Sequence, residues 1–149
     1  MSAGEYCNRE VVVVSKDEPV QEAITLMRQH HVGDVIVVEH TQQGAVPLGI
    51  LTDRDIVLEI LAEDVDLNAV NIGDVMSYEL VTVTESTTLL DTLKLMRQKG
   101  IRRIPVVNEK GGLEGLLTVD DLLELLAEQL NDIVALIATE QSSESRHRK

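Results

Sequence analysis

The chain has 149 residues, of which 44% are hydrophobic and 26% charged, as expected for one compact domain or two small units that share a core. The formal net charge of −13, and the lack of a basic stripe with interleaved aromatic residues, argue against nucleic-acid binding. A single cysteine excludes an internal disulfide framework. The polar start and short apolar runs predict neither a signal peptide nor a membrane span, so we expect a cytoplasmic protein.

The first half of the chain predicts a strand, a helix, two strands and a second helix, in that order. Short aliphatic runs typical of strands occupy residues 11–14, 35–38 and 48–51. Between the first two runs, apolar residues from Val20 to Met27 recur at helical spacing, and Pro19 suits the start of that helix. The second helix is expected to begin near Thr52.

The second half repeats this order of elements. Its strands are predicted at residues 80–83, 104–107 and 113–117. Leu89, Leu93 and Met96 mark a helix that stops at Gly100, and a last helix begins near Thr118. The tetrapeptide LMRQ recurs at an offset of 69 residues, whereas later motifs are offset by 66. The first repeat therefore carries three extra residues, which we place in a loop around residues 40–47.

Paired motifs mark the two halves as a duplication. VGDVIVV matches IRRIPVV, GILTDRD matches GLLTVDD, and the linker contains IGDVMS. The set resembles a tandem pair of cystathionine-beta-synthase-type (CBS) domains, a Bateman module. The resemblance implies an α/β fold in which two β-α-β-β-α repeats share one core around a pseudo-twofold axis. We assign residues 8–66 and 67–128 to the repeats and 129–149 to a helix end and a disordered tail.

The same resemblance implies a regulatory sensor. Such modules bind adenosine-containing ligands in the clefts between paired repeats: AMP, ADP or ATP is favoured here, ahead of NAD or S-adenosylmethionine. The signal would pass to a separate effector protein by a change of conformation or oligomeric state. The alternative is a ligand-free homodimer that acts as a protein-interaction module. We predict no catalytic residues and no metal ligands, because no nucleophile, paired-carboxylate or metal-ligand spacing stands out.

The threonine–aspartate pair that closes each repeat has two interpretations. Thr52 with Asp55, and Thr118 with Asp121, fit capping boxes at helix starts. The family resemblance instead places each pair at the ribose of a bound ligand. A carboxylate can accept hydrogen bonds from two ribose hydroxyls, and the threonine hydroxyl can add a third.

Two adjacent arginines, Arg102 and Arg103, are candidates for phosphate binding, because guanidinium groups suit phosphate oxygens. Solvated charge, or pairing with the chain's own carboxylates, is the simpler alternative. In the first repeat Gly33 and Asp34 occupy the matching positions, and Asp34 would repel a phosphate.

This difference ranks the two expected pockets. The pocket with Thr118, Asp121 and Arg103 is expected to suit a nucleotide best. Its adenine would lie against three residues of the first repeat: Val12, Val32 and Gly33. The pocket with Thr52 and Asp55 would borrow Arg102 and have the poorer charge balance.

The closing helices carry more apolar surface than one core needs. In the last helix we expect four residues to face the core: Leu122, Leu126, Ile133 and Ile137. Leu125, Val134 and Leu136 then remain for a partner, so we expect a homodimer.

Overall fold

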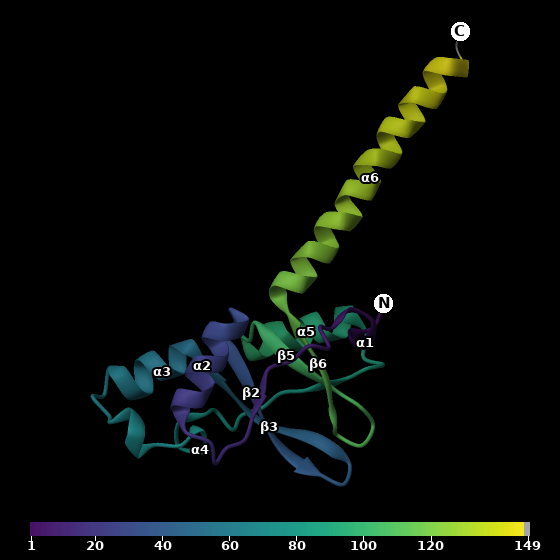
Figure 1. The fold of residues 1–149 in the computed structure, drawn as a ribbon. Coiled ribbons are helices and arrows are strands. Elements are labelled where there is room, and N and C mark those ends of the chain that lie inside the picture. The colour runs from purple at the N-terminus through teal and green to yellow at the C-terminus, as the bar shows by residue number, and fades with distance from the viewer. Residues whose placement is uncertain (148–149) are drawn as a thin grey trace. The chain divides into compact units, whose positions relative to one another are not determined.

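The computed structural model describes residues 1–147 (Figure 1). The chain divides into two compact units, residues 1–117 and the segment from Thr118 onward. The first unit holds nearly all of two three-stranded sheets, one from each repeat, and the second is a single long helix. None of the helices in the described range has the length and apolar character that crossing a bilayer requires.

The first sheet has the strand order β1-β2-β3. Its strands are β1 (Val13–Val14), β2 (Asp34–Thr41) and β3 (Gly44–Thr52), with β1 parallel and β3 antiparallel to β2. Helix α2 (Val20–His30) connects β1 to β2 and ends at His31, whose φ of 53° is left-handed. After β3 come α3 (Asp53–Ile56) and a π-helical turn, η1 (Val57–Leu61). The predicted strand, helix, strand, strand, helix order is confirmed.

The second sheet repeats this arrangement in the order β4-β5-β6. Its strands are β4 (Val83–Thr84), β5 (Arg103–Val107) and β6 (Leu113–Thr118), with β4 parallel to β5. Helix α5 (Leu89–Lys99) ends at Gly100, as predicted, with a φ of 64° that glycine adopts without strain. Helix α6 (Val119–His147) follows β6.

Two short segments that precede the repeats pair with the opposite repeat. The linker between the repeats has a 3-10 turn, η2 (Leu67–Ala69), and helix α4 (Ile72–Val75). The N–H groups of Ile72 and Gly73 in α4 donate to the Glu18 and Lys16 carbonyls at 2.9 and 2.8 Å. At the N-terminus, α1 (Ala3–Tyr6) makes the equivalent bonds, with every residue offset by 69 positions. The Ala3 and Gly4 N–H groups donate to the Thr87 and Glu85 carbonyls at 2.8 and 3.0 Å. The exchange is therefore reciprocal, as a pseudo-twofold axis requires.

The residues that follow these short helices bridge to the closing strands. Ser77 exchanges two backbone hydrogen bonds with Ile50 of β3, and Asn8 does the same with Leu116 of β6. A Cβ on Gly49 would overlap the Ser77 carbonyl, and one on Gly115 would lie 2.5 Å from the Cys7 sulfur. The glycines of GILT and GLLT are thus explained by close approach of a second backbone.

The three extra residues of the first repeat lengthen a hairpin. We expected a loop around residues 40–47, but β2 and β3 pair as far as Thr41 and Gly44, with a two-residue turn between them. A shift in register between Val37 and Val38 takes up one residue. The expectation of a loop is wrong, because residues added to two paired strands continue the alternation of side chains and lengthen the hairpin.

Apolar side chains from several elements form the core of the first repeat. It includes Val20, Ala23 and Met27 from α2, Val35 and Val37 from β2, and Leu51, Ile60 and Ile72. These residues are at most 9% exposed. Ile72 belongs to the linker, so the reciprocal exchange contributes to the core as well as to the backbone pairing.

Helix α6 differs from expectation in two ways. Leu122 is buried, but Leu126, Ile133 and Ile137 are 49–60% exposed, so the prediction that they face the core is wrong. These side chains belong to a continuous helix of 29 residues in the second compact unit. The segment from Thr139 was expected to be disordered, yet the helix continues to His147, and residues 148–149 fall outside the described range.

The close approach at Gly49 gives a stability prediction. Gly49→Ala should lower the free energy of unfolding by about 1–3 kcal/mol, because the new methyl group meets a fixed backbone carbonyl. Denaturant titration measures this. Gly44→Ala is the control, since its Cβ meets nothing within 4 Å and only its φ of 101° causes strain. A Gly49→Ala protein no less stable than Gly44→Ala would contradict the packing argument.

Candidate functional site

Both threonine–aspartate pairs form complete capping boxes. At the start of α3, the Thr52 N–H donates to Asp55 Oδ2 at 2.9 Å and the Asp55 N–H donates to Thr52 Oγ1 at 3.1 Å. At the start of α6, the corresponding distances for Thr118 and Asp121 are 3.1 and 3.2 Å. The structural interpretation of the motif is therefore confirmed at both places. Each carboxylate uses Oδ2 for capping.

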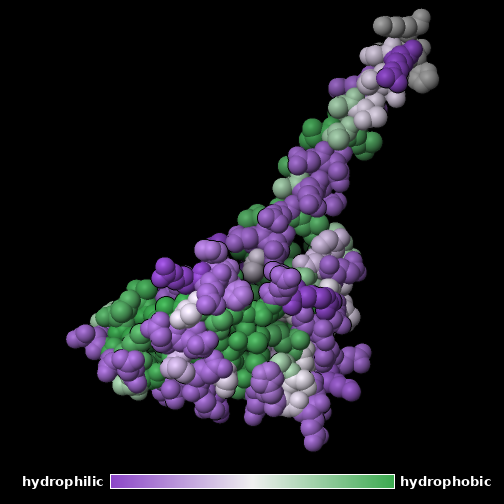
Figure 2. Space-filling model, in the orientation of Figure 1, coloured by the Kyte–Doolittle hydropathy of each residue, from purple (hydrophilic) through white to green (hydrophobic). Residues whose placement is uncertain are grey.

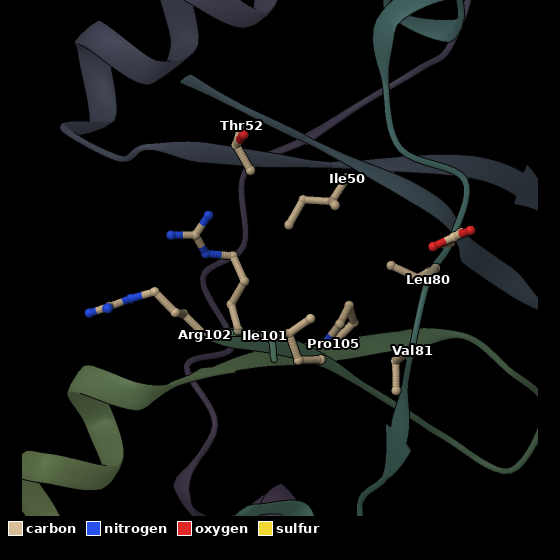
Figure 3. A pocket seen from close by; sticks show the side chains of 9 residues that line it. Ile50, Thr52, Leu80, Val81, Ile101, Arg102 and Pro105 are labelled. Carbon is tan, nitrogen blue, oxygen red and sulfur yellow. The ribbon is translucent and has the colours of Figure 1, made fainter. Parts of the chain in front are cut away.

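A cavity of about 220 Å³ lies beside Thr52 (Figure 3). We call it the Thr52 cleft, and its lining residues are Ile50, Thr52, Glu79, Leu80, Val81, Ile101, Arg102, Arg103 and Pro105. Ile50 and Thr52 come from β3, whereas the others come from the second repeat. The cleft therefore combines an apolar wall and a hydroxyl group with two guanidinium groups and the Glu79 carboxylate of the second repeat.

A second cavity, of about 560 Å³, occupies the matching place in the first repeat. We call it the Val12 cleft, and it is lined by Asn8, Glu10, Val11, Val12, Val13, Leu26, His30 and Val32. Four of these residues lie 69 positions before lining residues of the Thr52 cleft: Glu10, Val11, Val12 and Val32. The two clefts therefore share four equivalent positions, whereas Thr118 and Asp121, the counterparts of Thr52 and Asp55, do not line the Val12 cleft.

The arginines are not distributed as the sequence analysis expected. Arg102 and Arg103 both line the Thr52 cleft, whereas Val12 and Val32, expected beside Arg103, line the Val12 cleft. The Thr52 cleft, which we ranked second, thus has both guanidinium groups in its lining, although Arg103 also contacts Asp34, the neighbour of Gly33. The association of Thr118 and Asp121 with a ligand stays a prediction.

Asp34 pairs with Arg103 across the two repeats. The Nε–Oδ2 distance is 2.7 Å, although the angle is not that of a hydrogen bond and the buried Arg103 Nε has no such partner. Burial raises the pKa of the Asp34 carboxyl; Arg103 opposes this rise and the nearby Asp53 adds to it. The carboxylate therefore neutralises much of the Arg103 charge at some desolvation cost to itself.

Gly33 and Asp55 lie outside the linings of both clefts. The Gly33 carbonyl accepts from the Asp53 N–H at 2.9 Å, so Gly33 lies against the start of α3. A Cβ there would come 3.0 Å from an Asp53 carboxylate oxygen. Asp55 borders a separate cavity of about 480 Å³ that also contains Glu59 and Asp74. A ligand contact of Gly33 or Asp55 stays a prediction.

The remaining candidates are groups that could bind a metal ion and the Cys7 thiol. Within residues 1–147 no cluster of three or more histidine, cysteine or acidic side chains is arranged to hold a metal ion. Burial raises the pKa of the Cys7 thiol more than the nearby Arg9 lowers it, which does not favour a reactive thiolate.

The family model that matches this chain is that of the CBS domain, and it matches twice, over residues 3–62 and 72–128. The chain belongs to the CBS domain family. The first match begins at Ala3, so it includes α1, which exchanges backbone bonds with the second repeat. Our boundary at residue 8 left this segment out of the first repeat. The signal that reveals it is the match of AGEYCN to IGDVMS at the offset of 69.

Proteins from several organisms resemble this chain along most of its length. An uncharacterized protein of Methanopyrus kandleri is 35% identical over 84% of this chain and 62% of its own length. The CBS domain-containing protein YhcV of Bacillus subtilis is 42% identical over 76% of each chain. The crystal structure of the cytosolic domain of the Mg²⁺ channel MgtE in complex with ATP has a TM-score of 0.70 and 26% identity, over 83% of this chain and 48% of that one.

Sequence reasoning missed several cleft residues. Glu79, Ile50 and Pro105 line the Thr52 cleft, but none was named as a candidate, although Ile50 belongs to GILTDRD and Pro105 to IRRIPVV. The signal for Glu79 was present, because it matches Glu10 at the same offset and both follow a short helix. Ile50 and Pro105 are ordinary strand residues, and only their place in the fold assigns them to the cleft.

The Asp34 environment predicts a pH-dependent stability. Because the pKa of Asp34 is raised, the folded protein binds more protons than the unfolded chain just above the ordinary aspartate pKa of about 3.9. The free energy of unfolding of the wild type should therefore fall, relative to that of Asp34→Asn, as pH rises through this window. Denaturant unfolding of both proteins from about pH 3.5 to 7 measures the difference. A difference that grows with pH would mean that attraction to Arg103 outweighs burial.

Proposed function

We propose that this CBS pair is a regulatory sensor that binds an adenosine-containing ligand, with AMP, ADP or ATP favoured over NAD or S-adenosylmethionine. The Thr52 cleft is the proposed site. The observation that carries the proposal is the meeting of an apolar wall, a hydroxyl group and a guanidinium group in one cavity between the repeats. An adenine nucleotide has a complementary set of groups: an apolar ring face, ribose hydroxyls and phosphate.

Each part of the cleft has a role in this proposal. Ile50, Val81 and Ile101 supply aliphatic side chains against which a purine ring can pack. Thr52 Oγ1 accepts a hydrogen bond from the Asp55 N–H, and its own O–H remains able to donate to a ribose oxygen. Capping and ligand binding are therefore compatible for Thr52.

Arg102 is the proposed phosphate ligand. Among the described residues, the three ion pairs involve Arg9 and Arg103 only, so the exposed Arg102 guanidinium is left for a ligand. Arg103 is a poorer choice because Asp34 lies 2.7 Å from its Nε. The MgtE domain supports the ligand class, since it was crystallised in complex with ATP.

The size of the cleft links binding to a conformational response. Small-molecule pockets usually measure about 300–1,000 Å³, and the Thr52 cleft measures about 220 Å³. A nucleotide would favour a wider state of the cleft and shift the population toward it. We propose that this change, in a chain that self-associates, is the signal to a separate effector protein.

A ligand-free interaction module is the second candidate. The observation that favours it is the presence of both complete capping boxes, which account for the duplicated threonine and aspartate without a ligand. Mass spectrometry of small molecules released when the purified protein is denatured separates the candidates, because the sensor should release an adenine nucleotide.

Substitution of Arg102 tests the proposed site. Arg102→Ala should weaken ATP or AMP binding about tenfold or more, the usual effect of losing a hydrogen bond to a charged group, and leave adenosine binding unchanged. Isothermal titration calorimetry with the three ligands measures both effects. Arg28→Ala, which removes an exposed arginine on α2, is the matched control. Equal losses for adenosine and AMP, or full AMP affinity in the folded Arg102→Ala protein, would contradict the assignment.

A further inference from the structure

Helix α6 carries an exposed apolar stripe with a regular spacing. Its members are Leu123, Leu126, Leu130, Ile133 and Ile137, separated by three, four, three and four residues. We call these five residues the α6 stripe. Each is 49–62% exposed in the single chain. Green apolar side chains alternate with purple polar ones along this helix in Figure 2.

The spacing is compatible with a coiled coil. Over two heptads, apolar residues three and four positions apart fit both the seam of a left-handed coiled coil and one face of an ordinary amphipathic helix, so the charges around the stripe have to identify the occupant. The stripe corresponds to successive a and d positions. It spans 15 residues, or about 22 Å of helix axis, and the next position in the series is the charged Glu140.

The charges on α6 favour a second copy of the same helix as the occupant. The positions that flank the stripe hold Ala127, Gln129, Val134 and Leu136, all uncharged. The acids Glu124, Glu128 and Asp132 lie at b, f and c positions, away from the seam. Two chains of formal net charge −13 can therefore meet at the stripe without placing like charges opposite each other. An anionic membrane surface would be repelled by the acidic face.

We infer that α6 associates with α6 of a second copy of this chain through the α6 stripe, in coiled-coil packing. The inference rests on the self-association included in the proposed function and names the surface that carries it. It also replaces our earlier choice of Leu125 and Val134 as the partner-facing residues. Leu125 falls at a c position and Val134 beside the seam.

Sedimentation equilibrium of the full chain tests the inference. The wild type should have at least twice the chain mass at micromolar concentration. Leu130→Glu places a charge at the centre of the stripe and should raise the dissociation constant by about tenfold or more. Leu90→Glu, at a 72% exposed position on α5, is the control and should leave the dissociation constant unchanged. Circular dichroism verifies that both variants are folded.

A second pair of variants tests whether association can be strengthened, so its result does not depend on disrupting the helix. Glu140→Leu extends the stripe by one position and should lower the dissociation constant by about tenfold. Glu128→Leu makes the same chemical change on the opposite face and should have no such effect. An assembly that resists Leu130→Glu but dissociates with Leu90→Glu would overturn the inference and leave self-association intact. A monomeric wild type would overturn both.

Discussion

The backbone exchange between the repeats is the constraint on which the first unit depends. The segment before each repeat pairs with elements of the other repeat, at Lys16 and Glu18 on one side and Glu85 and Thr87 on the other. The closing strand of each sheet then accepts a second backbone neighbour, which only glycine at positions 49 and 115 permits. Because the exchange is reciprocal, neither sheet forms its full set of contacts alone. The cleft that holds β3 side chains opposite Arg102 exists because of this pairing.

Charge distinguishes the two places in the fold that the duplication makes equivalent. The positions that hold Arg102 and Arg103 in the second repeat hold Gly33 and Asp34 in the first. Because Asp34 stands where the second repeat has Arg103, the first repeat lacks a cation at this position. The Asp34 carboxylate also pairs with Arg103 of the second repeat and neutralises its charge. A phosphate that approaches the Thr52 cleft therefore meets one available guanidinium group and one that is already paired. Selectivity between nucleotides and nucleosides then depends mainly on Arg102.

The fold was predictable from the sequence, and the grouping of the site residues was not. Strands and helices follow from periodicity, and LMRQ with the two GxLT motifs reveals the duplication. The capping boxes also follow from local spacing, because a cap joins residues three positions apart. The partner of Arg103 depends instead on how two repeats face each other, which no local pattern specifies. Residues 40–47, between the two predicted strands, were taken for a loop, although Thr41 and Gly44 continue the strand pairing.

Asp34 also connects the cleft to the start of a helix. It follows Gly33, whose carbonyl accepts from the Asp53 N–H at the first residue of α3. Asp53 itself raises the pKa of Asp34, so the two carboxylates already interact. Under the proposed function the phosphate is held by Arg102, next in sequence to Arg103, so its charge acts close to the Asp34–Arg103 pair and, through Asp34 and Asp53, close to the first turn of α3. That turn leads into η1, where Val57, Leu58 and Leu61 are 46–69% exposed. A change of charge in the cleft thus has a short covalent and hydrogen-bonded path to an apolar surface, with no need for a rearranged core.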